Sequence, residues 1–455
     1  VITRRGIMKI SFTFFGIVLF SLIFYLSFSY LMISIASPGS FYVSLQGNDD
    51  NPGTEEKPWK TIQHAADTLQ PGQTVYIHQG LYHESVATVH SGNETQGPIT
   101  FTNYPGEKPV IDGDGVKDAN TGFTINQSFI NISGLQIKNW DDHGIWIESA
   151  GYIEISECLI SQVTCGIGLV DGTHHFVLNG VEAYEFILYG FDASPAGGND
   201  CHHGTFNNCI AHSGQDPDQN VDGFALGHGT QHDFELNHCL AYEVFDGFDI
   251  SAHNTTLNGC EAHHCWNSGY KIWEDQVKLV NCLSYRNQSA NVELDWNNKP
   301  KTVTLQNCTL VGADTFNIWI NNGSDSLQMY NTILADGKNI GLAFEDKNAT
   351  NYQGDYNIFH NSNPDRVIAV GYEDEFSMDQ TQSGAWTAYS GQDQHSLVID
   401  SLSQLFIDAI NNDFHLNGDS LAIDYGTNQG APGVDFDENS RPQGTGIDIG
   451  AYEYY

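Results

Sequence analysis

The sequence predicts an all-β fold, a parallel β-helix (β-solenoid) with a short N-terminal cap helix. Three observations support this prediction. Segments with two strand-like runs, separated by turn residues, recur about every 22 residues, which is typical of a solenoid. The composition, with 46 Gly and 13 Pro in 455 residues, favours short strands and turns over long helices. With 40% hydrophobic and 12% aromatic residues, the chain can also build a packed core and is not a disordered polymer.

The chain begins with a segment typical of protein export. Arg4, Arg5 and Lys9 precede a run without charge that ends at Ala36. The last residues of this run are small and resemble a signal-peptidase site, whereas the run of about 27 residues is also long enough to cross a bilayer. We therefore expect residues 1–37 to be a signal peptide or a membrane anchor. Both alternatives place the body of the protein outside the cytoplasm, secreted or held at the cell envelope.

The β-helix is expected over residues 38–345, with different structures at its two ends. Apolar residues recur at helical spacing between Trp59 and Leu69, which suits a short helix that caps the first coil. The periodicity fades after about Phe344, and the remaining residues are rich in Asn, Asp and Gly. We expect residues 346–455 to form a C-terminal extension packed on the last coils.

Two rows of residues mark the successive coils. In the first row, a small or apolar residue, often Cys, follows Asn or Gly. In the second row, Gly or Asn opens a run of alternating apolar residues. Stacked coils place residues of one row about 4.8 Å apart. The first row is Leu135, Cys158, Val181, Cys209, Cys239, Cys260, Cys282, Cys308 and Thr332; the second is Gly144, Gly166, Gly190, Gly223, Gly247, Gly269, Asn291, Asn317 and Asn339.

The cysteines and asparagines of the first row have separate interpretations. We interpret the nine cysteines as small buried hydrophobes in an inward row, not as a disulfide framework. The asparagines beside them predict a ladder of side-chain amides along the stack. These asparagines are Asn208, Asn281, Asn307 and Asn331.

The charge of the chain excludes several classes of partner. The 17 Lys and Arg residues stand against 56 Asp and Glu residues, a net charge of −39. Such a chain offers no basic patch for phosphates, so we expect no nucleic-acid partner and no membrane contact except through an N-terminal anchor. An anionic polymer could bind only where bound cations or lysines reverse the local sign.

Charged residues gather in phase on consecutive coils. Asp222 and Asp246 directly precede second-row glycines, whereas Asp249, Lys271 and Glu293 stand two residues after the second-row position of their own coils. Carboxylates that close together either raise their pKa values or share a cation. Three carboxylates without His or Cys in phase form an oxygen site that suits Ca²⁺ and not Zn²⁺. The structural alternative is a surface charge ladder in which Lys271 only pairs with its neighbours.

This cluster fits the β-elimination of a polyuronate. A Ca²⁺ ion that bridges the protein and a uronate carboxylate would stabilise the charge that develops when the C5 proton is removed. Lys271 would be the base, provided that partial burial and a neighbouring cation lower its pKa.

Three short motifs carry a resemblance to a known family. The segments that begin at Asp222, Asp246 and Gly269 (DGFA, DGFD and GYKI) resemble the site of the family 9 polysaccharide lyases, and residues 41–77 are similar to the N-terminal cap of many exported β-helix proteins. The resemblance spans about residues 41–345.

The resemblance implies a right-handed parallel β-helix and a site. In this site Asp222, Asp246 and Asp249 would bind the catalytic Ca²⁺, and Lys271 would be the Brønsted base. The family usually has two consecutive Asp residues before its middle Gly, and here the first of them is Phe245. This difference predicts weaker calcium binding unless a backbone carbonyl, water or substrate fills the position.

Other side chains have weaker signals. Arg286 and Glu293 are the candidates for substrate binding, Arg286 because its planar fork fits a carboxylate, although an exposed turn residue is the plain alternative. The pairs at residues 202–203 and 263–264 are adjacent histidines without helical metal-ligand spacing. We interpret both pairs as solvated turns.

The sequence therefore predicts a secreted, monomeric polysaccharide lyase that cleaves an acidic polysaccharide, pectate in particular, with Ca²⁺ as cofactor. Two alternatives belong to other classes. One is a β-helix glycoside hydrolase that uses two of the aspartates as acid and base. The other is a non-catalytic adhesin or carbohydrate-binding solenoid, in which calcium would only be a structural staple.

Overall fold

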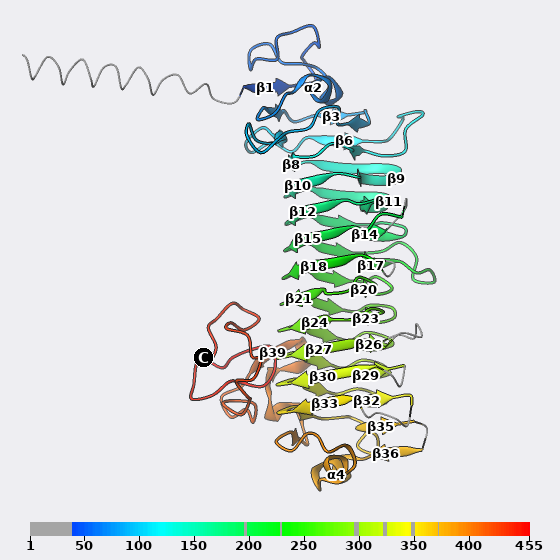
Figure 1. The fold of residues 1–455 in the computed structure, drawn as a ribbon, viewed down its shortest axis with the longest axis vertical. Coiled ribbons are helices and arrows are strands. Elements are labelled where there is room, and N and C mark those ends of the chain that lie inside the picture. The colour runs from blue at the N-terminus through cyan, green and yellow to red at the C-terminus, as the bar shows by residue number, and fades with distance from the viewer. Residues whose placement is uncertain are drawn as a thin grey trace, which may run out of the picture.

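The computed structural model describes residues 39–455, except 195–197, 228–229, 295–299, 322–324, 347–350 and 372. The expected leader, residues 1–37, lies outside the described residues. Within the described part of the chain, no helix has the length and apolar character needed to span a membrane. The chain winds into an elongated stack of coils with the N-terminal cap at one end (Figure 1).

One side of the stack is a parallel sheet of 13 strands, called here the first sheet. Each coil contributes one strand, and successive strands pair in register. The strands are β1 (Ser40–Val43), β2 (Thr74–Ile77), β5 (Ile99–Asn103), β8 (Ile130–Ser133), β10 (Gly151–Ser156), β12 (His174–Asn179), β15 (His202–Asn207), β18 (His232–Asn237), β21 (Thr256–Asn258), β24 (Val277–Val280), β27 (Thr302–Gln306), β30 (Ser326–Tyr330) and β33 (Tyr352–Asp355).

Two further parallel ladders complete each coil. The second ladder follows the first sheet along the chain: β3 (Leu81–Tyr82), β6 (Val110–Asp112), β9 (Gln136–Glu148), β11 (Leu159–Val170), β13 (Glu182–Tyr184), β16 (Ile210–His212), β19 (Leu240–Tyr242), β22 (Glu261–His263), β25 (Leu283–Tyr285), β28 (Thr309–Val311), β31 (Ile333–Ala335), β34 (Ile358–Phe359) and β37 (Leu397–Val398). The third ladder shares β9 and β11 and adds β4 (Val86–Ala87), β7 (Phe123–Ile125), β14 (Tyr189–Ser194), β17 (Asp222–Leu226), β20 (Phe248–Ile250), β23 (Tyr270–Ile272), β26 (Ala290–Leu294), β29 (Phe316–Ile320), β32 (Ile340–Phe344), β35 (Ile368–Val370) and the antiparallel β36 (Asp374–Phe376). The predicted parallel β-helix is confirmed.

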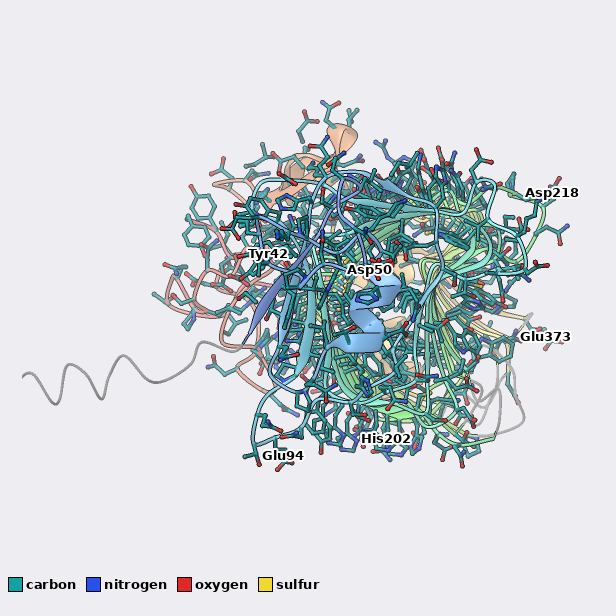
Figure 2. The ribbon with its side chains drawn as sticks, turned by 90° about the horizontal axis from the view of Figure 1, so that it is seen from above. Tyr42, Asp50, Glu94, His202, Asp218 and Glu373 are labelled. Carbon is teal, nitrogen blue, oxygen red and sulfur yellow. The ribbon has the colours of Figure 1, made fainter. Side chains whose placement is uncertain are left out.

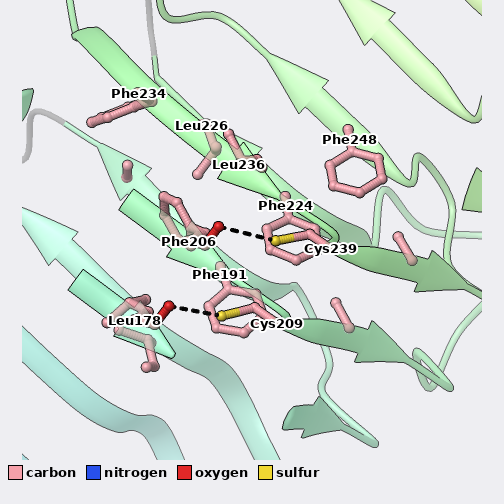
Figure 3. Packing of buried hydrophobic residues seen from close by; sticks show 14 of the residues in the cluster. Leu178, Phe191, Phe206, Cys209, Phe224, Leu226, Phe234, Leu236, Cys239 and Phe248 are labelled. Carbon is pink, nitrogen blue, oxygen red and sulfur yellow. Dashed lines mark hydrogen bonds between the residues drawn. The ribbon is translucent and has the colours of Figure 1, made fainter. Parts of the chain in front are cut away.

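The interior is filled by rows of like side chains. Phe191, Phe224 and Phe248 stack with ring centroids 4.7 and 4.8 Å apart (Figure 3). The interpretation of the cysteines is confirmed, because all nine are free and buried. Cys239 Sγ, for example, donates to the carbonyl of Phe206 at 3.5 Å (Figure 3). A small thiol both fills the row and satisfies a backbone acceptor.

From β8 onward, the corner after each strand of the first sheet uses a left-handed residue. The φ angles lie between 50° and 53° at Glu157, Asn208, His238, Asn281, Asn307 and Asn331. Gly and Asn reach this region at lower cost than other residues, so the corner explains why they recur before the cysteines. The predicted amide ladder is present between Asn331 Nδ2 and Asn307 Oδ1, at 3.2 Å.

The second row of glycines brings successive coils close together. A Cβ atom on Gly190, Gly223 or Gly247 would lie 2.7, 2.6 or 2.6 Å from the carbonyl oxygen of the next glycine of the row. A side chain does not fit there. Farther along, Asn291 and Asn317 take this position and join their amides at 2.8 Å.

The helix α2 (Ile62–Thr68) caps the first coil, as predicted, and buries Ile62, Ala65 and Ala66. At the other end, parallel pairing continues through β33, β34, β35 and β37, beyond the expected boundary at residue 345. The last coils lead into α3 (Met378–Gln382), α4 (Ala385–Ser390), η2 (Leu402–Gln404), η3 (Ala409–Asn411) and the antiparallel pair β38 (Phe406–Asp408) and β39 (Asp413–Leu416).

The C-terminal segment folds back along the stack (Figure 1). Its backbone carbonyls at Val434 and Thr427 accept hydrogen bonds from the corner amides of Asn281 and Asn331, both at 2.8 Å. The extension therefore packs against coils well before the last ones, because the corner asparagines there need acceptors.

The conformational role of the left-handed corners can be tested at Asn208, because its side chain is exposed and a substitution there removes little packing. Asn208→Gly should leave the stability nearly unchanged, whereas Asn208→Val should lower the free energy of unfolding by roughly 1–2 kcal/mol because a β-branched residue is strained at this φ. Urea unfolding of both variants, beside the wild type, measures the difference. An equal loss in both variants would contradict a conformational role for the corner.

Candidate functional site

The charged row predicted from the repeat is present on the third ladder. Asp249, Lys271 and Glu293 are register partners on the adjacent strands β20, β23 and β26. The residues on either side of each are buried in the core, so the pleat turns these three side chains away from it. The register thus brings together the side chains that the 22-residue spacing selects.

Asp222 and Asp246 lie one coil apart, directly before the close-packed glycines, and both are buried. Asp222 accepts hydrogen bonds from the Asp246 backbone N–H at 3.2 Å and from Asn220 Nδ2 at 2.8 Å. Asp246 Oδ1 accepts from the Ser268 N–H at 2.9 Å and from Asn267 Nδ2 at 2.8 Å. These contacts hold both carboxylates in fixed orientations.

Lys271 brings an ammonium group to this pair. Its Nζ lies 3.5 Å from Asp246 Oδ2 and 5.0 Å from the ring centroid of Trp273, whose face attracts a cation. The lysine side chain is 15% exposed, and the Asp246 side chain is fully buried. The lysine side chain is therefore partly exposed, while the carboxylate that it pairs with is shielded from water.

Glu293 is also tied to the cluster. It is buried, and its Oε2 accepts a hydrogen bond from Ser268 Oγ at 2.7 Å. The backbone and the hydroxyl of Ser268 thus connect Glu293 to Asp246. A contact between Glu293 and substrate stays a prediction.

The supporting side chains Asn220, Asn267 and Ser268 were not predicted from the sequence. Each stands one to three residues before a glycine of the second row, in a turn between the second and third ladders. Their position before these glycines is the one feature of the sequence that could have pointed to them. Polar residues are common in turns, so this feature alone does not select them.

Among the described residues of the cluster, the carboxylates outnumber the ammonium group of Lys271. Burial, followed by the charges of Asp246 and Asp249, raises the pKa of Asp222 well above its ordinary value. Burial also raises the pKa of Asp246, against the opposing influence of Lys271 and of the hydrogen bonds that Asp246 accepts. A further cation at this place would favour the ionised forms of both groups.

The donor set fits Ca²⁺, which prefers carboxylate oxygens. Asp246 Oδ2 is buried and accepts no hydrogen bond from the described residues. Among the described residues, the group of three side chains whose ligand atoms all lie within 4.8 Å of one another is not this cluster. It consists of His203, His232 and Asp233. Binding of one ion by Asp222, Asp246 and Asp249 would therefore need side-chain rotation.

Phe245 stands where the resembled family has a further Asp. It is half-buried, and its backbone N–H donates to the carbonyl of Val221 at 2.6 Å. An apolar ring adds no ligand, so the calcium would depend on the three aspartates and on oxygens from water or substrate.

Arg286 is not brought into this cluster. It occupies a left-handed corner with a φ of 55°, and its exposed guanidinium donates to the carbonyl of Ile410 in the C-terminal segment. It lines a hollow of about 360 Å³ together with Asp314, Asp336 and Lys338. Its observed contact connects the extension to the coils, and its role toward substrate stays a prediction.

Comparison with known proteins places these features in a family. A family model described as "Pel9A-like, right handed beta helix region" matches residues 41–293, which include all the strands of the charged row. This description agrees with the predicted hand of the helix.

Individual proteins are similar over different lengths. The chain is 28% identical to pectate lyase L of Paenibacillus polymyxa (strain SC2) over 364 residues, which cover 70% of this chain and 74% of that protein. It is 42% identical to the uncharacterized protein YwoF of Bacillus subtilis (strain 168) over 102 residues, and this match spans only 22% of the length of either protein. The crystal structure of pectate lyase Pel9A superposes with a TM-score of 0.59 at 15% identity and covers 93% of this chain and 98% of its own.

The pairing of Lys271 with buried carboxylates makes a prediction about stability. Lys271→Met should lower the free energy of unfolding by roughly 1–3 kcal/mol in the presence of chelator, because Asp246 loses its nearby cation. Lys278→Met is the matched control, since Lys278 is exposed on β24, and its effect should stay within about 0.5 kcal/mol. Urea unfolding measures both, and equal effects would show that the ion pair does not stabilise the fold.

Proposed function

The chain belongs to the Pel9A-like right-handed β-helix family, and on this premise we propose that it is an exported polysaccharide lyase that cleaves an acidic polysaccharide by β-elimination. Pectate is the proposed substrate because two of the similar proteins are named pectate lyases. Export is supported by the hydrophobic run that ends at Ala36.

The observation that carries the proposal is the position of Lys271. Its amine lies 3.5 Å from Asp246, one strand from Asp249, and remains accessible beside Trp273. An amine at the edge of a buried carboxylate cluster suits a substrate that carries carboxylates of its own, since such a substrate needs positive charge where it meets this acidic protein.

In the proposed reaction, Lys271 removes the C5 proton of a uronate residue. The electrons of the C–H bond form the double bond between C4 and C5, the C4–O bond to the next sugar breaks, and the released oxygen takes a proton from water. Only the neutral amine can accept the proton. Asp246 favours the charged form of Lys271, so the pair must loosen when substrate is bound.

Asp222, Asp246 and Asp249 would hold the calcium ion. When bound, Ca²⁺ supplies positive charge that neutralises the substrate carboxylate and stabilises the anion developing at C5. Asn220, Asn267 and Ser268 keep the carboxylates oriented through the hydrogen bonds that they donate to two of these aspartates.

The first test of this function follows the product. The wild type acting on polygalacturonate should generate the ultraviolet absorbance of an unsaturated uronide, and Lys271→Ala should lower kcat by roughly 10²–10⁴-fold, the usual contribution of a general base. Lys278→Ala should keep the wild-type rate.

Other outcomes identify the alternatives. New reducing ends without ultraviolet absorbance would show a hydrolase. Binding of polymer without any cleavage would show a carbohydrate-binding solenoid. Full turnover by Lys271→Ala would remove this lysine from the role of base.

The second test concerns the metal. Dialysis against EDTA should abolish lyase activity, and added Ca²⁺ should restore it, because Asp222, Asp246 and Asp249 together carry more negative charge than Lys271 can offset. Asp249→Asn should need a higher Ca²⁺ concentration for half-maximal rate, since one charged ligand is lost. Undiminished turnover in excess chelator would contradict the metal role.

A further inference from the structure

The first sheet carries columns of imidazoles at the ends where its strands begin. The rings of His174 and His202 stack at 5.4 Å with 11° between their planes, and those of His202 and His232 at 5.2 Å with 4°. A second column stacks His175 on His203 at 4.8 Å and 2°. The pair 202–203, expected from the sequence to lie in a solvated turn, instead begins the strand β15, and its two rings belong to two parallel columns.

A second set of left-handed residues, at the start of these strands, explains why both neighbours project outward. The second residue of each pair has a positive φ, which is 50° at His175, 54° at His203, 62° at Asp233 and 52° at Asn254. Two adjacent side chains then point to the same side of the backbone instead of alternating. In the coil after His203, this corner position is taken by Asp233, so a carboxylate follows the imidazole column.

The exchange of imidazole for carboxylate creates a compact group of three ligands. His232 Nδ1 lies 2.7 Å from Asp233 Oδ2, and His203 Nε2 lies 3.6 Å from the same oxygen. One ligand atom of each residue lies within 4.8 Å of the others. His203 and Asp233 line a surface hollow of about 460 Å³ together with Asn254 and Glu235.

Neighbouring side chains orient these ligands. Asn254 Nδ2 donates to Asp233 Oδ1, which leaves Oδ2 facing the imidazoles. His203 Nδ1 contacts His202 Nδ1 at 2.7 Å, so its Nε2 is the nitrogen presented to Asp233. Outer contacts of this kind, which fix the ring and the carboxylate, accompany metal-binding histidines in general.

From this geometry we propose that His203, His232 and Asp233 form a binding site for a divalent transition-metal ion of the Zn²⁺ class. Two imidazole nitrogens and one carboxylate oxygen are the ligands that zinc accepts, with water in its fourth position, whereas Ca²⁺ and Mg²⁺ prefer oxygen ligands alone. The ion connects the coil of His203 to the coil of Asp233 and stabilises their stacking.

The site is separate from the carboxylate cluster. It lies where β18 begins, on the first sheet, whereas the cluster lies on the third ladder. Figure 2, a view along the stack, labels one residue close in sequence to each site. His202 stands next to His203, and Asp218 stands in the loop that leads to Asp222; the two residues lie on different sides of the molecule. The proposal does not depend on lyase activity, because its readouts are binding and stability.

The test titrates the full-length protein, kept in Ca²⁺, with ZnCl₂. Calorimetry should give one Zn²⁺ per chain at this site, and the thermal midpoint should rise with Zn²⁺ concentration by mass action but not with added Mg²⁺. Co²⁺ in place of Zn²⁺ should give the visible absorption of a four-coordinate ion.

Variants locate the binding. His203→Gln and Asp233→Asn should each lower the Zn²⁺ affinity by at least about 100-fold. Asn254→Gly, which removes the orienting contact and still permits the positive φ, should lower it by about 10–100-fold. His264→Gln is the matched control: His264 also occupies a left-handed corner, with a φ of 52°, and contacts its neighbour His263 at 2.9 Å, but it has no part in the group of three. Far-ultraviolet circular dichroism checks that each variant is folded.

Three results would overturn the proposal. They are the absence of Zn²⁺ binding by the wild type, wild-type affinity in both His203→Gln and Asp233→Asn, and a loss of affinity in His264→Gln as large as in those variants. Each distinguishes a site built by these three residues from general binding by surface histidines.

Discussion

The spacing of parallel strands is the constraint on which this structure depends. Every coil pairs with the next at about 4.8 Å, so the phase of a residue within the coil decides which side chains touch it above and below. Side chains that interact favourably with identical side chains, such as aromatic rings and amides, can occupy the same position on several successive coils. Phe191, Phe224 and Phe248 stack in this way, and Asn291 and Asn317 join their amides. A row of like residues in the sequence is then a sign of packing.

Carboxylates cannot follow this rule, because the same spacing makes them repel one another. Asp222 and Asp246 occupy one row on adjacent coils, and the pKa values of both are raised. The neighbouring row alternates in sign through Asp249, Lys271 and Glu293, which places an ammonium between two acids. Buried like charges are costly, and this cost is the reason why we propose that a cation and an anionic chain bind at this short stretch of the stack.

Sequence periodicity could predict the parts of the site that repeat. Asp249, Lys271 and Glu293 keep nearly constant spacing, so their register follows from counting. The contacts of Arg286 could not be found in this way. They depend on the C-terminal segment, more than 100 residues away in sequence, whose Ile410 carbonyl accepts from its guanidinium. The left-handed corners could be predicted only in part. Recurrent Asn and Gly residues indicate some of them, but Glu157 and His238 adopt the same backbone conformation.

The same logic connects the two candidate sites. In each, one coil places a residue of different charge beside those of the neighbouring coils: Lys271 stands between Asp249 and Glu293, and Asp233 follows two histidines at the corresponding position. His203 and Asp233 are far apart along the chain, so local motifs do not reveal the pair, yet the coil spacing brings them into contact. In a solenoid, an exchanged residue can thus complete a group of ligands, because the neighbouring coils already hold other side chains nearby, as His203 and Asp233 show. For this reason both candidate sites of this fold lie where a row is interrupted, and not where it repeats.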